Sequence, residues 1–160
     1  GSPLCTVALC GDGNGTAGPL TGDVWAWFGG VGGSTPETSS VSQTVWLPFA
    51  AYVDLEFELG IGAVTAPFTD ELFVGMDGNS VASYLEPSVP ETTYTARSVI
   101  VDAYADGLPH TLQFEYVKGV DGNGANFSLD DVALTEVSCQ ALLLDGFETH
   151  DTSNWSAAVP

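Results

Sequence analysis

The sequence predicts an all-β protein, an antiparallel two-sheet β-sandwich of the jelly-roll type. Hydrophobic and polar residues alternate along most of the chain between residues 23 and 135. Turn sequences rich in Gly, Asp, Asn and Pro separate about eight such stretches. No stretch keeps a helical hydrophobic period over three turns. Strands that follow one another through short turns pair antiparallel, which favours a jelly roll.

The first half of the chain holds three predicted strands. Residues 23–30 carry aromatic side chains on both faces, and residues 39–48 place Trp46 on the face opposite Val41 and Val45. The clearest alternation runs over residues 51–62, where one face is acidic and should be wet. Its two faces are Val53, Leu55, Phe57 and Leu59 on one side and Asp54, Glu56 and Glu58 on the other.

Residues 70–87 read as a hairpin, because the DGN turn at 77–79 supplies residues that tolerate a positive φ. Residues 93–109 form a strand, one helical turn and a Gly/Pro break, and strands follow at 110–119 and 126–134. The shared period of two predicts one core. It contains Val53, Leu55, Phe57, Leu59, Leu72, Val74, Leu112, Phe114, Phe127 and Leu129.

The chain divides into three predicted parts. Residues 1–22 form an N-terminal segment that contains two of the three cysteines, and residues 23–136 form the sandwich. Residues 137–160 contain one apolar patch followed by a polar end, and they are predicted to be a C-terminal extension or linker. No signal peptide is visible and no apolar run is long enough to span a bilayer, so no membrane insertion is expected.

The charge balance narrows the possible partners. There are 21 acidic residues and two basic ones, Arg97 and Lys118, which gives a net charge of −19. Nucleic acid is excluded because its recognition needs a basic footprint. Anionic membrane surfaces are disfavoured for the same reason. Such a surface suits a soluble protein, a salty medium or divalent cations.

The cysteines leave several pairings open. Cys5 and Cys10 can close a short loop if the backbone turns, and Cys139 is then free or has lost its partner. Cys139 can also pair with one of the first two. A disulfide would indicate an oxidising compartment outside the cytoplasm.

The stretch NFSLDDVAL at 126–134 contains the main candidate site. Phe127 and Leu129 share one face of the strand, but Val132 and Leu134 are out of phase with them by one residue. A β-bulge at Asp130 and Asp131 restores the phase and lets both carboxylates leave the core. Carboxylates beside exposed backbone carbonyls suit Ca²⁺. The alternative is a bulge whose aspartates are solvated or accept N–H groups.

Catalysis has little support in the sequence, and the chain is predicted not to be an enzyme. His110 shares a strand face with Leu112 and is expected to be packed, and no metalloprotease or nucleophile-elbow motif occurs. Sugars present CH faces that stack on aromatic rings. Trp46 and Tyr52 are the candidate ligand-binding residues, since both lie in outward rows.

The segments SVSQTVWLP, DELFVGMDGNSVASYLEP and NFSLDDVAL occur in an order that resembles galactose-binding-like jelly rolls. These include carbohydrate-binding modules and the MAM-like domains of secreted bacterial proteins. The N-terminal LCTVALCGDG is similar to the paired-cysteine start of MAM-type domains, which favours a Cys5–Cys10 bridge. The resemblance also implies a structural calcium ion held by Asp130. Because no Glu occurs before Glu37, Asp12 or Asp23 would supply the missing ligand.

Together these observations predict a non-catalytic accessory module of a larger, multidomain, secreted bacterial protein. It would bind a polysaccharide or cell-surface glycan and contain a structural calcium ion. The alternative is a calcium-stapled module for protein–protein contact without a sugar site.

Overall fold

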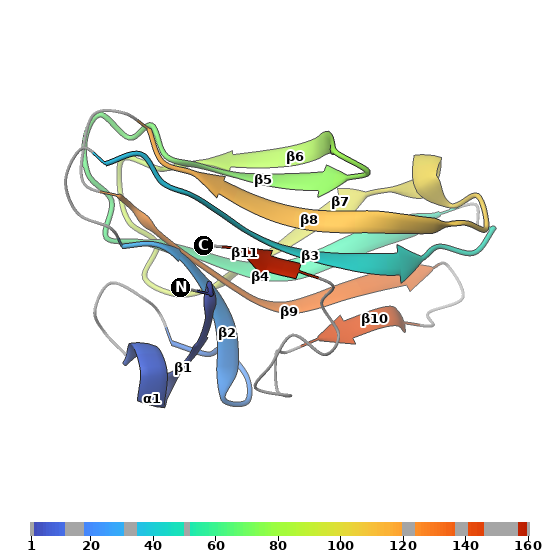
Figure 1. The fold of residues 1–160 in the computed structure, drawn as a ribbon, viewed down its shortest axis with the longest axis horizontal. Helices are drawn as coiled ribbons and strands as arrows, with labels where there is room; N and C mark the ends of the chain where they lie inside the picture. Colours follow the sequence, from blue (N-terminus) through green and yellow to red (C-terminus); the bar gives the residue numbers. More distant parts are fainter. Residues whose placement is uncertain are drawn as a thin grey trace.

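Two antiparallel sheets pack face to face and confirm the predicted fold class (Figure 1). The structure is a computed structural model. It describes residues 2–11, 18–30, 35–49, 52–119 and 124–136, together with the backbone of 141–145 and 157–159.

The strands fall into a six-stranded sheet and a five-stranded sheet. The six-stranded sheet has the order β1 (Leu4–Thr6), β2 (Val24–Gly29), β9 (Asn126–Glu136), β4 (Val53–Gly62) and β7 (Thr95–Ile100), and β10 (Ala141–Asp145) also pairs with β9. The five-stranded sheet has the order β11 (Ala157–Val159), β3 (Thr38–Trp46), β8 (Pro109–Val117), β5 (Glu71–Met76) and β6 (Asn79–Leu85). Two short helices, α1 (Val7–Cys10) and η1 (Asp102–Tyr104), complete the described elements.

One hydrophobic core fills the space between the sheets, as the period-two pattern predicts. Phe57 of β4 shows how the layers meet. Its ring lies edge-on to Phe114 of β8 at 5.1 Å and to Tyr84 of β6 at 5.7 Å between centroids. All ten predicted core residues are buried, namely Val53, Leu55, Phe57, Leu59, Leu72, Val74, Leu112, Phe114, Phe127 and Leu129.

The predicted hairpin at 70–87 is confirmed as β5 and β6. Asp77 and Gly78 form its turn with φ values of 51° and 77°. Two positive φ angles in succession are characteristic of the type I′ turn, whose twist matches that of the flanking strands. The DGN sequence therefore sets the turn and the first residue pairs of the hairpin, and the register shifts between Val74 and Gly75.

The C-terminal segment, predicted as an extension or linker, contributes two short strands. β2 pairs with β9 only as far as Leu129, so the edge of β9 beyond that point needs another partner. β10 pairs with β9 there, between Val132 and Thr135, and runs beside it in Figure 1. β11 pairs with the outer edge of β3.

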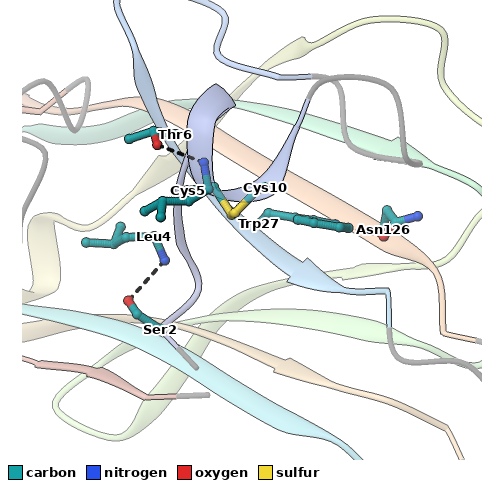
Figure 2. Close-up of a disulfide and its surroundings, with 8 residues drawn as sticks. Ser2, Leu4, Cys5, Thr6, Cys10, Trp27 and Asn126 are labelled. Carbon is teal, nitrogen blue, oxygen red and sulfur yellow. Dashed lines mark hydrogen bonds between the residues drawn. A yellow bond between two sulfur atoms is a disulfide. The ribbon is translucent and has the colours of Figure 1, made fainter.

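The N-terminal segment is joined to the six-stranded sheet by β1 and closed by a disulfide (Figure 2). Cys5 and Cys10 are bonded to each other, which confirms the predicted pairing. The Thr6 side chain caps α1 by accepting the Leu9 backbone N–H at 3.3 Å. The Trp27 indole points toward Asn126 and donates Nε1–H to its Oδ1 at 2.7 Å.

Loss of the disulfide should reduce stability through the unfolded state. Closing so short a loop is worth about 2 kcal/mol, because the cross-link removes entropy from the unfolded chain. Cys10→Ser is therefore expected to lower the urea midpoint. Leu9→Ser is the matched control, since Leu9 lies in the same helix and is 80% exposed. Equal midpoints for Cys10→Ser and the parent protein would contradict a stabilising bridge.

Candidate functional site

The paired aspartates of β9 have different environments. Asp130 is fully buried, whereas Asp131 is only partly buried. One Asp130 oxygen accepts the backbone N–H groups of Leu20 at 2.7 Å and Thr21 at 3.3 Å. The other accepts the N–H of Asp131 at 2.8 Å. Asp130 pairs with Glu58 on the face of the sheet opposite Leu129, so it lies outside the hydrophobic core. The 20–21 backbone buries it on that face and supplies its donors.

The predicted β-bulge is present at this point. Glu56 of β4 pairs with Ala133, and Glu58 pairs with Asp130, so β9 has one residue more than β4 in this interval. The extra residue allows Asp131 to adopt a φ of 47°. Its side chain accepts the Thr21 hydroxyl at 2.7 Å. The bulge restores the phase that brings Val132 and Leu134 back into the core.

The pKa of Asp130 is raised to about 7, chiefly because burial disfavours its charged form. The three backbone N–H groups act in the opposite direction. A neighbouring contact fixes the same loop, because the Tyr94 hydroxyl donates to the Gly18 carbonyl at 2.6 Å. Asp130, Asp131 and Tyr94 therefore anchor residues 18–21 against the sheet.

Calcium at these residues remains a prediction. Three N–H hydrogens already point at the Asp130 carboxylate, which leaves it little capacity for a cation. Within the described residues, no group of three or more His, Cys, Asp or Glu side chains has the geometry of a metal site. Asp23 lies on the exposed segment before β2, and Asp12 lies outside the described residues. The described side chains alone do not make a centre of six to eight oxygens.

His110 is buried, as expected, and is held between two carboxylates. Its Nδ1 lies 2.7 Å from Asp77 Oδ2 and its Nε2 lies 2.9 Å from Asp106 Oδ1. Both ring nitrogens can donate to these carboxylates only when the imidazole is protonated, so the two contacts favour the charged form. The Asp77 hydrogen bond is the largest cause of a raised His110 pKa. The pKa of Asp77 is lowered by the Thr111 backbone N–H and then by His110, and the pKa of Asp106 is lowered chiefly by His110. This arrangement links the β5–β6 turn to the loop before β8.

The two predicted sugar-binding aromatics lie on different sheets. Trp46 ends β3, points outward and is 63% exposed. Tyr52 is 39% exposed and directly precedes β4 of the other sheet. Its hydrogen bond to Asp54 raises the pKa of the Tyr52 hydroxyl. The outward row predicted for each residue is confirmed, but they do not form one platform.

An open hollow lies instead on the outward face of the five-stranded sheet. Its volume is about 290 Å³. Paired rows of outward positions build it: Gln113 of β8 faces Gly75 of β5, and Glu115 faces Phe73. The Gln113 amide donates to Glu115 at 3.3 Å. The lining consists of one aromatic ring with amide, carboxylate and hydroxyl groups, from Phe73, Gly75, Gly78, Asn79, Ser80, Gln113 and Glu115.

Gly75 creates the space for this hollow. A Cβ at Gly75 would meet only the Asn79 and Gln113 carbonyl oxygens, at 3.6 and 3.9 Å. Any larger side chain would extend outward into the hollow, because the neighbouring Val74 and Met76 point into the core. A glycine inside a strand often marks a close approach by a ligand. Gly75 inside a strand is the sequence signal for this site, and Trp46 and Tyr52, the predicted sugar-binding residues, do not line the hollow.

Neither a protein-family model nor a curated protein matches this chain. Solved structures do match. TmCBM61, in complex with beta-1,4-galactotriose, shares 13% identity over 84% of this chain and 82% of its own, with a TM-score of 0.52. PbXyn10C CBM in its apo form gives 15% identity, 84% and 87% coverage and a TM-score of 0.47. A cyclase from Fischerella sp. TAU shares 14% identity over 82% of this chain and 71% of its own, with a TM-score of 0.46.

The likeness to TmCBM61 is one of fold, since both chains are β-sandwiches. The resemblance to MAM-like domains remains a prediction. Among the described residues, no helix has the length and the apolar character that a membrane crossing requires.

Chelation tests the predicted calcium ion. An ion that binds only the folded protein would stabilise it by about 2.7 kcal/mol at a hundredfold excess over its Kd. EDTA is then expected to lower the Tm, and Asp130→Ala should abolish that response. If EDTA leaves the Tm unchanged while Asp130→Ala still lowers it, the carboxylate acts through its N–H donors alone.

The His110 contacts predict a pH dependence of stability. A raised folded-state pKa stabilises the protein fully below the unfolded value of about 6.5, and this contribution is lost as pH rises through the folded value. The lowered pKa values of Asp77 and Asp106 act at the acid end, because their contribution is lost as pH falls below about 4. We expect the free energy of unfolding to fall between pH 6 and about pH 9.

His110→Gln should flatten that fall, which urea titrations at both pH values would measure. Asp102→Asn is a suitable control, because Asp102 lies in the adjacent η1 and neither of the His110 contacts involves it. An unchanged slope in His110→Gln would show that another group titrates.

Proposed function

We propose that this chain is a non-catalytic carbohydrate-binding module that holds a glycan in the hollow on the outward face of the five-stranded sheet. The observation that carries the proposal is the lining of that hollow, where the Phe73 ring lies beside Gln113 and Glu115. A sugar offers an apolar CH face to an aromatic ring and hydroxyl groups to amides and carboxylates. Ligand sites commonly combine an apolar surface with a few such convergent polar groups.

The rest of the face supports a ligand longer than one sugar. Trp46 pairs with Pro109 and so lies four residues along β8 from Gln113, roughly 13 Å away. Between them the outward positions carry the small hydroxyl side chains of Thr44 and Thr111. A polysaccharide chain that runs along β8 would contact the hollow first and the indole of Trp46 next.

The fold likeness adds support of a general kind. TmCBM61 has the same sandwich and binds beta-1,4-galactotriose. A secreted, extracellular location in a bacterium, as one part of a larger protein, belongs to the same proposal. The Cys5–Cys10 disulfide supports it, because disulfides persist in oxidising compartments.

A second candidate function is contact with another protein through the end of the sandwich. Phe49 is 85% exposed and Leu108 is 55% exposed. The Phe49 ring packs over Gly107, the residue before Leu108, so closely that a Cβ built there would lie 3.0 Å from the ring. Apolar side chains that gather on a surface are typical of interaction sites. The double variant Phe49→Ser/Leu108→Ser would remove this patch and leave the hollow intact.

Filling the hollow is the most direct test of glycan binding. Gly75→Val suits a strand, removes no polar group and places a branched side chain where the ligand would lie. Gly75→Val and Phe73→Ala, each made as a single variant, are expected to weaken glycan binding at least tenfold, or about 1.4 kcal/mol. Isothermal titration against a panel that includes β-1,4-galactan measures the change.

Ser98→Ala provides the control, because Ser98 is exposed on the other sheet, away from the hollow, where its hydroxyl donates a hydrogen bond to Asp54. Its affinity should equal that of the parent protein. A glycan that binds Gly75→Val as tightly as the parent protein would place the site elsewhere. Binding that is lost only in the Phe49/Leu108 variant would favour the surface at the end of the sandwich.

A further inference from the structure

We infer that the hollow selects neutral glycans and rejects those that carry carboxylate or sulfate groups. This inference rests on the proposed function and specifies its substrate class. Recognition of a sugar carboxylate or sulfate requires a guanidinium or ammonium group, usually in a charge-assisted hydrogen bond. The chain contains two such residues, Arg97 and Lys118, so the position of each can be checked.

Arg97 lies at the edge of the sandwich, where β7 of one sheet faces β6 of the other. Its Nη2 contacts Glu91 Oε1 at 2.5 Å. Its guanidinium lies over the Tyr84 ring, 5.4 Å from the centroid. Tyr84 pairs with Leu72, a core residue, so this contact is on the inward side of β6. Arg97 is therefore directed away from the outward face that carries the hollow.

Lys118 does not reach the hollow either. It is only 4% exposed and follows β8 at the far end from Trp46. In the part of the chain that the structure describes, the remaining side chain near this face that can carry a positive charge is His110. It is buried, and both of its ring nitrogens contact carboxylates. Within the described residues, every basic side chain is thus either buried or paired away from the ligand.

The hollow itself is negative. Glu115 lies in its lining, and the chain around it has a net charge of −19. An anionic sugar would meet a like charge at short range and a repulsive field at long range. A neutral sugar meets neither. Its hydroxyl groups can donate to the Glu115 carboxylate, and the Gln113 amide has both donors and acceptors for the same ring.

The test is a comparison of matched polymers by isothermal titration. We expect measurable binding to a member of the neutral set, which includes β-1,4-galactan, mannan and agarose. We expect at least a hundredfold weaker binding to polygalacturonate, alginate and carrageenan. Each titration is repeated in EDTA, so that calcium cannot bridge an anionic polymer to the protein. Affinity for the neutral polymer should change less than twofold between about 20 mM and about 500 mM salt, because no ion pair contributes.

The outcomes separate this inference from the proposed function. Binding of an anionic polymer in EDTA, if abolished by Gly75→Val, would overturn the inference and leave glycan binding in the hollow intact. Anionic binding that appears only with calcium would overturn it as well, if Gly75→Val abolishes that binding. If no polymer of either set binds, the proposed function fails, and the inference fails with it.

Discussion

The bulge in β9 is the constraint on which the six-stranded sheet depends. β9 pairs with β4 along its length and with β2 and β10 in succession on its other side. Without the extra residue at Asp131, either Phe127 and Leu129 or Val132 and Leu134 would face outward. The bulge buries both pairs. Asp130 lies opposite Glu58, on the face of the sheet away from the core. There the backbone N–H groups of Leu20 and Thr21 donate to its carboxylate and join the N-terminal segment to the sheet.

The same solution recurs at other buried acids. Asp70 is 3% exposed and accepts the Tyr116 hydroxyl at 2.6 Å and the N–H groups of Gly119 and Ala125 at 2.9 and 2.6 Å. Glu86 is 4% exposed and accepts the Thr65 N–H at 2.6 Å. In a chain with two basic residues, backbone N–H groups and hydroxyls take the place of cations. Each such carboxylate fixes a loop, because its donors come from segments distant in sequence.

Local patterns could be read from the sequence, and long-range contacts could not. The alternation in 51–62, the DGN turn and the phase slip at Asp130 depend on neighbouring residues, and each gives the structure expected of it. The burial of Asp130 depends on Leu20, which is 110 residues away. The hollow also cannot be recognised in the sequence, because Phe73 and Gln113 belong to different strands and come together only through the pairing of β5 with β8. The edge that β10 covers is likewise a product of pairing, since it exists only where β2 ends.

The scarcity of basic residues links the fold to the kind of ligand that its surface can bind. Arg97 pairs with Glu91 at the edge of the sandwich, and His110 lies between Asp77 and Asp106. These positive groups therefore stabilise the fold. Among the described residues, the outward face of the five-stranded sheet carries hydroxyl, amide and carboxylate groups, the aromatic rings of Phe73 and Trp46, and apolar side chains such as Leu85. Such a surface has acceptors in excess and no ammonium or guanidinium donor. A ligand that complements it must bring many hydroxyl donors, an apolar face and no negative charge.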